Sequence, residues 1–181
     1  MSRSHGLRPA SPRTILLAGP MGAGKSSVGR QLAELTGWPY LDNDAMLLAS
    51  TGKAARELIS EGGIGRLHDE ERRILHRTLE HPGPLVASIA ASAVDREEER
   101  TLLIATGSVV YLRCRLPTLL KRLRQDQAGG GTRPLLDRDP LPALSEMQER
   151  RSKLYEEVAW RVIDADYLDP RQLAEQVLEV L

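Results

Sequence analysis

The stretch Gly19-Pro20-Met21-Gly22-Ala23-Gly24-Lys25-Ser26 matches the pattern G-x-x-x-x-G-K-[ST] in full. An apolar run, residues 14–18, precedes it, and residues 25–35 follow with helical periodicity. Glycines in such a loop let successive N–H groups point at a phosphate chain, and the helix adds the positive end of its dipole. A chance glycine turn is the alternative. The pattern predicts a nucleotide site, with Lys25 at the β- and γ-phosphates and Ser26 at Mg²⁺. The residues expected to contact the nucleotide here are Gly22, Ala23, Gly24, Lys25, Ser26 and Ser27.

Short apolar runs alternate with helical segments along the rest of the chain. This alternation predicts parallel strands with helices on both faces of the sheet. Strands are expected at residues 14–18, 39–42, 85–88, 109–112 and 162–163. Helices are expected at 25–35, 45–80 (broken at Gly52 and at 61–65), 96–105, 117–124, 140–160 and 170–181.

Length and composition limit the possible functions of the chain. Its 181 residues, 41% hydrophobic and 28% charged, are typical of one globular domain. The 25 basic residues equal the 25 acidic residues in number, which argues against a nucleic-acid or membrane partner. The single cysteine, Cys114, excludes an internal disulfide and is expected to be a packed small hydrophobe.

Residues 1–13 (MSRSHGLRPASPR) hold almost no apolar side chains. We expect a disordered tail there, followed by one domain over residues 14–181. A faint likeness to a transit peptide is the alternative. Because the apolar region of a secretory signal is missing before Thr14, we expect a cytoplasmic protein, and we favour a monomer.

Two carboxylates, Asp42 and Asp44, follow the second predicted strand. Ligands of doubly wound sheets lie beyond the carboxyl ends of the strands, where the phosphate loop also lies. One carboxylate can then hold Mg²⁺ through water, and the other can accept a proton from an attacking hydroxyl. The alternative is an aspartate that caps the helix beginning near Ala45, which explains one of the two more easily than both.

With these motifs in hand, the chain resembles the shikimate kinases. The resemblance runs from about Thr14 to Leu181 and rests on GPMGAGKSSVGRQLAELTGWPYLDND, EGGIGRLHDEE, GSVVYLR, TRPLLD and RSKLYEEVA. It implies an α/β/α P-loop kinase with a five-stranded parallel sheet in the order 2-3-1-4-5 and a lid. It also implies transfer of the ATP γ-phosphoryl group to a ring hydroxyl, with Mg²⁺.

The resemblance assigns roles to five residues. Asp42 resembles the Mg²⁺-linked aspartate, and Asp44 resembles the base that binds substrate hydroxyls. Arg133 resembles the lid arginine, Arg151 an arginine that binds the substrate carboxylate, and Arg122 an arginine near the adenine. A lid over residues 126–136 agrees with three glycines, residues 129–131, that favour a mobile hinge. The alternatives are a flexible surface loop at the glycines and a solvated helix face for Arg122 and Arg151.

Three departures from the family pattern fall where the substrate is expected. The family's Gly-Glu-x-x-Phe-Arg is aligned with residues 63–68, so that Ile64 stands for the glutamate and His68 for the arginine. The family's three glycines after the third strand are replaced by Ala90-Ala91-Ser92, which adds methyl groups and disfavours a positive φ. His68, Ala90 and Ala91 remain candidate substrate-binding residues beside Asp44 and Arg151. A surface histidine is the alternative for His68, and residues 69–73 are expected to form a solvated helix face.

Three functions remain open. The first is an ATP-dependent kinase of shikimate or a related cyclic polyol. The second is a kinase of the same fold that acts on a neutral, carboxylate-free cyclitol. The third is a nucleotide-binding regulator without efficient catalysis, which retention of Asp44 and Arg133 argues against. The partners expected are therefore ATP or ADP and a small hydroxylated metabolite.

Overall fold

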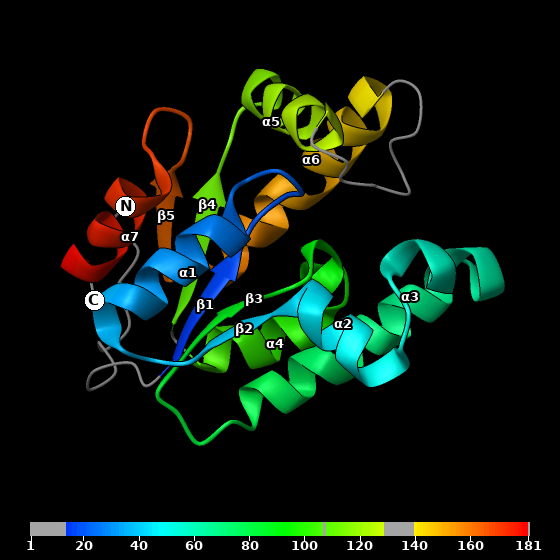
Figure 1. Cartoon of the computed structure of the whole chain (residues 1–181), viewed down its shortest axis with the longest axis horizontal. Helices are drawn as coiled ribbons and strands as arrows, with labels where there is room; N and C mark the ends of the chain where they lie inside the picture. The colour runs from blue at the N-terminus through cyan, green and yellow to red at the C-terminus, as the bar shows by residue number, and fades with distance from the viewer. Residues whose placement is uncertain (1–13, 107, 129–139, 181) are drawn as a thin grey trace.

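A parallel sheet forms the centre of the molecule (Figure 1). The computed structural model describes residues 14–106, 108–128 and 140–180. Within them the strands are β1 (Thr14–Ala18), β2 (Tyr40–Asp42), β3 (Leu85–Ser88), β4 (Val109–Arg113) and β5 (Arg161–Asp164). They pair in the order β2-β3-β1-β4-β5, and each pairing is parallel. The predicted fold and strand order are confirmed.

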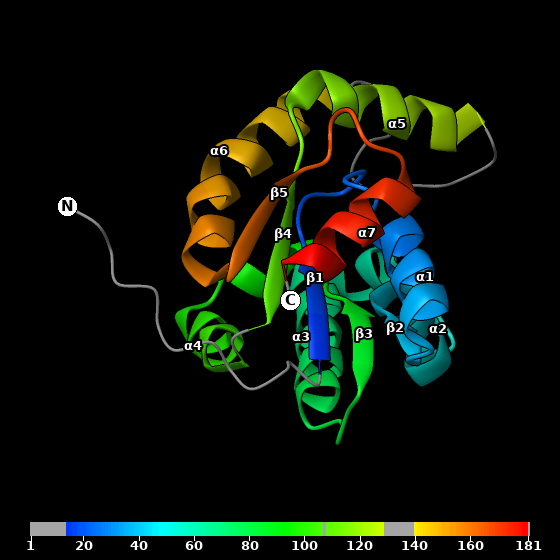
Figure 2. The ribbon, with the colours of Figure 1, turned by 90° about the vertical axis from the view of Figure 1, so that its left-hand side faces the viewer.

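Helices cover both faces of this sheet (Figure 2). Helices α1 and α7 lie on one side, and α4 and α6 lie on the other. The helices are α1 (Lys25–Thr36), α2 (Asn43–Thr51), α3 (Ala55–Leu79), α4 (Glu97–Thr106), α5 (Leu116–Ala128), α6 (Pro140–Val158) and α7 (Pro170–Glu179), with a short 3₁₀ turn, η1 (Ala91–Val94). The turn η1 is an element that the sequence did not predict.

Strand β1 is apolar throughout because both of its faces are covered. Ile15 and Leu17 pack in the core under α1 and α7, whereas Leu16 and Ala18 pack in the core under α3, α4 and α6. The chain contains no Phe, and the described core is mainly aliphatic. The carboxyl end of this rigid central strand leads directly into the phosphate loop.

The glycine-rich stretch at residues 61–65 interrupts the long helical segment α3, as the sequence predicted. The predicted break at Gly52 is confirmed. Helix α2 ends at Thr51, and Gly52 caps it with a left-handed φ of 68°. Helix α3 continues from Ala55 to Leu79, and Gly63 is its one non-helical residue, with φ 73° and ψ 178°. The predicted break over residues 61–65 is confirmed, and it lies at Gly63, where two helical stretches meet at a kink. The predicted tail (residues 1–13) and the glycines and Arg133 of the predicted lid lie outside the described residues.

Candidate active site

The phosphate loop connects β1 to α1 and depends on glycine backbone geometry. Gly24 adopts a φ of 95° immediately before α1, a conformation that other residues rarely adopt. Gly19 has a φ of 144°, and a Cβ there would lie 2.7 Å from the carbonyl oxygen of Leu112. The Lys25 ammonium donates to the carbonyl oxygens of Gly19 (2.8 Å) and Pro20 (3.0 Å). Lys25 thus lies across the loop whose N–H groups are expected to hold phosphate.

Asp42 connects the phosphate loop to the end of β2. Its Oδ2 accepts hydrogen bonds from the hydroxyls of Ser26 and Tyr40, each at 2.7 Å. Its Oδ1 caps α2 by accepting from the N–H groups of Asp44 (3.0 Å) and Ala45 (3.3 Å). Burial alone would raise the pKa of Asp42, but these hydrogen bonds outweigh it and hold the pKa below its ordinary value. Asp42 is therefore an ionised carboxylate as well as a helix cap.

The Ser26–Asp42 contact suits a magnesium ion. Mg²⁺ prefers hard oxygen ligands and usually keeps several of its waters. The Ser26 hydroxyl and the Asp42 carboxylate supply such oxygens 2.7 Å apart beside the phosphate loop. These two residues fit the predicted metal site and would hold the ion that accompanies the nucleotide phosphates.

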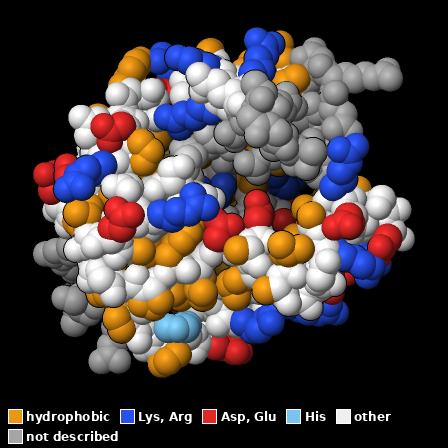
Figure 3. Space-filling model, in the orientation of Figure 1, with side chains coloured by type: hydrophobic (Ala, Val, Ile, Leu, Met, Phe, Trp, Pro, Cys, Tyr) orange, Lys and Arg blue, Asp and Glu red, His pale blue; other side chains and the backbone are white. Residues whose placement is uncertain are grey.

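A large cleft opens from the phosphate loop across the ends of the strands. Its volume is about 1040 Å³, and the described residues that line it come from the loop, α2, α3, the turn after β3, α5, α6 and α7. Figure 3 shows it as the hollow at the centre of this face, with acidic side chains gathered beside it. Asp44, Lys25 and Ser26 all line this one cleft, as the sequence predicted.

The far end of the cleft is formed by α3, η1 and α6. His68, Ala90, Ala91 and Arg151 line it, so the four remaining predicted substrate residues lie on the same cleft as Asp44. Burial lowers the pKa of His68; Asp95 opposes this shift, while Arg151, Arg150 and Arg96 add to it. His68 is therefore a cleft-lining imidazole that is neutral at neutral pH, rather than a histidine on a solvated surface.

The turn after β3 adopts an ordinary backbone despite its methyl groups. Ala90 has φ −58° and ψ 148°, and Ala91 begins η1. The expected strain from a positive φ is thus absent at Ala90. The buried Tyr155 holds this turn, because its hydroxyl donates to the carbonyl oxygen of Ala91 at 2.8 Å. The replacement of glycine here changes the surface of the cleft and leaves the course of the chain unstrained.

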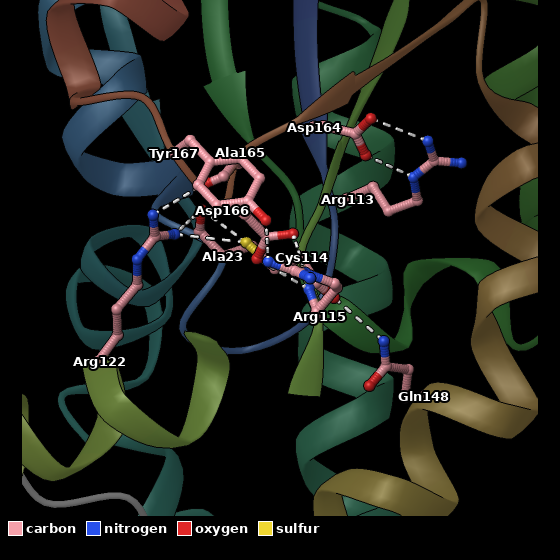
Figure 4. A network of polar contacts seen from close by, with 10 residues as sticks. All are labelled: Ala23, Arg113, Cys114, Arg115, Arg122, Gln148, Asp164, Ala165, Asp166 and Tyr167. Carbon is pink, nitrogen blue, oxygen red and sulfur yellow. Dashed lines mark hydrogen bonds and ion pairs between the residues drawn. The ribbon is translucent and has the colours of Figure 1, made fainter. Parts of the chain in front are cut away.

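Arg122 joins α5 to the phosphate loop (Figure 4). Its guanidinium donates to the carbonyl oxygens of Ala23 (3.0 Å) and Ala165 (2.6 Å) and lies 3.3 Å from the sulfur of Cys114. Cys114 is fully buried in the core, and burial raises the pKa of its thiol to about 11. Arg122 therefore stabilises the phosphate loop and the residues after β5 through hydrogen bonds, and it also lines the cleft beside the phosphate loop.

Comparison with known proteins agrees with this geometry. The family model described as "Shikimate kinase" matches residues 21–181. The chain belongs to the shikimate kinase family.

A shikimate kinase of Histophilus somni is 32% identical over 174 residues, which are 95% of this chain and 97% of that one. One of Xanthomonas euvesicatoria is 34% identical over 166 residues, covering 91% and 89% of the two chains. A solved shikimate kinase of Acinetobacter baumannii, in complex with shikimate, has a TM-score of 0.86 at 32% identity and covers 94% and 93%. The chemistry of this shikimate kinase family member is that of an ATP-dependent phosphotransferase with an alcohol group as acceptor.

Two acidic residues at the site of this shikimate kinase family member were not predicted from the sequence. Glu71 was assigned to a solvated face, but it lines the cleft and accepts a 2.5 Å hydrogen bond from Ser92. Burial raises its pKa, the Ser92 hydrogen bond lowers it, and the charge of Asp44 raises it further. Asp95 was not singled out, yet it pairs with Arg151. The spacing of three residues between the candidate His68 and Glu71, which places both on one face of a helix, was the available signal for Glu71.

Proposed function

We propose that this protein binds Mg·ATP on the phosphate loop and transfers the γ-phosphoryl group to a hydroxyl of shikimate or a related cyclic polyol. The observation that carries the proposal is the cleft that brings the loop lysine, the Ser26–Asp42 pair and Asp44 together. Gly22, Ala23, Gly24, Ser27 and Arg122 complete the nucleotide side of the site. From the sequence we also propose that the protein is a cytoplasmic monomer. Among the described residues, no helix is long and apolar enough to cross a membrane.

Each charged residue has a separate role in this reaction. Lys25 neutralises charge that develops on the β- and γ-phosphates, and Arg133 supplies further positive charge from the lid. Ser26 and Asp42 would hold the magnesium ion that accompanies the nucleotide. Asp44 accepts the proton of the attacking hydroxyl, while His68, Ala90, Ala91 and Arg151 form the surface against which the ring lies.

An ADP-release assay with shikimate and a panel of cyclitols tests the proposal, with phosphorylated product identified by mass spectrometry. We expect at least one ring to be phosphorylated. Asp44→Asn is expected to lower turnover by about 10²–10⁴-fold while equilibrium binding of Mg·ATP persists, because a general base contributes that much. If nucleotide binds but no ring is phosphorylated, the protein is a nucleotide-binding regulator instead, and full turnover by Asp44→Asn removes the assigned base.

A further inference from the structure

The buried arginine of the acceptor site already holds a carboxylate. Arg151 Nε lies 2.7 Å from Asp95 Oδ1, and Arg151 Nη2 lies 2.6 Å from Asp95 Oδ2. This two-point geometry is the one in which an arginine binds a free carboxylate most strongly. The pair is well shielded from water, since the Arg151 and Asp95 side chains are 7% and 22% exposed. An internal acid therefore already occupies one edge of the guanidinium that lines the acceptor end of the cleft.

Little unpaired positive charge remains around this pair for a second acid. Of the other cations on the adjoining pocket, Arg72 pairs with Glu99 (2.5 Å), and the half-exposed Arg96 lies 3.5 Å from Asp69. Arg150 also reaches Asp95, with Nη2 and Oδ2 3.2 Å apart, but its side chain is 55% exposed and screened by water. His68 contributes no positive charge at neutral pH, for the reason given above. Glu71 brings a second carboxyl to the same wall. Burial raises the pKa of Asp95, but its hydrogen bonds with Arg151 outweigh this effect and hold the pKa below its ordinary value, so Asp95 is ionised at neutral pH.

Asp95 lies next to the acceptor end of the cleft. His68, Glu71, Ala90 and Ser92 line both the large cleft and a small adjoining pocket of about 30 Å³ that Asp95 also lines. A ligand carboxylate on the remaining edge of Arg151 would share one guanidinium with Asp95. Two carboxylates a few ångströms apart repel each other unless one is protonated.

We infer that Asp95 is a specificity-determining residue that stands in for a substrate carboxylate on Arg151, so that the acceptor is an uncharged polyhydroxylated ring. This inference rests on the proposed function and narrows its substrate class. The walls of the site agree with it, because Ile64, Leu67, Ala90 and Ala91 present apolar surface to the cleft. Such surface suits the face of a neutral ring, while Asp44 and Glu71 offer acceptors for its hydroxyls.

A matched pair of acceptors tests the inference on the wild-type protein. Shikimate and its primary amide have the same ring and a planar group of the same size, and they differ in charge. A saturated cyclitol without any acid group is the third acceptor. We expect the KM for the amide to be about ten- to a hundredfold below that for shikimate, the range that one charge-assisted hydrogen bond represents.

The variant Asp95→Asn removes the charge and keeps the shape. It is expected to lower the KM for shikimate by about tenfold or more and to change that for the amide by less than about threefold. Asp164→Asn is the matched control, because Asp164 of β5 forms the same kind of two-point pair with Arg113 of β4 (2.7 and 3.0 Å). It is expected to change neither KM. A merely structural role of Asp95 would move both acceptors together.

The outcomes separate the two proposals. A wild-type KM for shikimate equal to or below that for the amide overturns the inference and leaves the proposed function standing. An increase in the KM for shikimate in Asp95→Asn also overturns it, because Asp95 would then be positioning Arg151 for an acid. Circular dichroism checks the fold of the variant; if it does not fold, the wild-type comparison decides alone. If no acceptor is phosphorylated, the proposed function fails, and the inference fails with it.

Discussion

The ring of Tyr40 lies against the backbone of Gly29, with no room for a side chain between them. A Cβ at position 29 would lie 2.2 Å from Cε2 and 2.7 Å from Cζ of that ring. The Tyr40 hydroxyl in turn lies 2.7 Å from Asp42 Oδ2 and 2.7 Å from Ser88 Oγ. Gly29 thus lets α1 approach β2 closely enough for one tyrosine to join the ends of two strands beside the Ser26–Asp42 pair.

The variant Gly29→Ala is expected to displace Tyr40 and to lower the free energy of unfolding by about 1–3 kcal/mol, as overpacking of a core contact does. Thermal unfolding measures the loss, and the Mg·ATP titration shows whether Asp42 moves. Gly65→Ala is the matched control, since a Cβ there would meet no atom within 4 Å. In a helix that change is neutral or stabilises by about 0.5–1 kcal/mol. Equal stability of Gly29→Ala and the wild type would contradict the contact.

Replacing Lys25 by alanine removes the ammonium that lies across the phosphate loop. We expect kcat to fall by about 10²–10³-fold, the usual effect of deleting one charge-stabilising donor, while the far-UV circular dichroism spectrum is unchanged. Lys53→Ala is the control, because Lys53 pairs with Glu61 at 2.6 Å on an exposed surface. Normal turnover by Lys25→Ala would show that the loop does not hold the transferred phosphate.

Removal of divalent cations by a chelator is expected to abolish turnover, and Mg²⁺ is expected to restore it. Ser26→Ala is expected to raise the half-saturating Mg²⁺ concentration by about tenfold or more, because even partners of metal ligands contribute that much to affinity. Ser60→Ala, whose hydroxyl donates to the Glu57 carbonyl on an exposed turn of α3, serves as control. Turnover that persists without divalent cations would refute the metal assignment.

The lowered pKa of His68 makes stability depend on pH. Unfolded histidine titrates near pH 6.5, and burial lowers the folded value, so the unfolded chain binds the proton more readily. This contribution to stability is full above about pH 6.5, declines as the pH falls below it, and levels off below the folded pKa. Melting temperatures at about pH 7.5 and about pH 5.5 are therefore expected to differ more in the wild type than in His68→Gln. An equal difference in both proteins would contradict the burial of His68.

The parts of the site that the sequence predicted are local in the chain. Residues 19–26 specify a loop by themselves, and the apolar run before them is long enough for one buried strand. Asp42 could be assigned to the carboxyl end of β2 because it is the last residue of that short strand. The sequence pattern did not show whether Asp42 caps a helix or acts beside Ser26. Both roles turn out to belong to the same carboxylate, each using one oxygen.

The parts that the sequence did not predict depend on distant partners. The pairing of Asp95 with Arg151 spans 56 positions, and no spacing within either segment indicates it. Glu71 lies among charged neighbours, and its inward direction follows from the path of α3 after the bend at Gly63.

Because Cys114 is buried, the native protein has no thiol that is expected to react with thiol reagents in the folded state. Cys114 is the one cysteine of the chain, it is fully buried, and a pKa of about 11 leaves little thiolate at neutral pH. Maleimide dyes react with thiolates at accessible positions, so they are not expected to label Cys114 in the folded protein. A cysteine introduced on an exposed surface away from the cleft, such as at Ile104 of α4, could therefore carry a fluorophore without any prior removal of the native one.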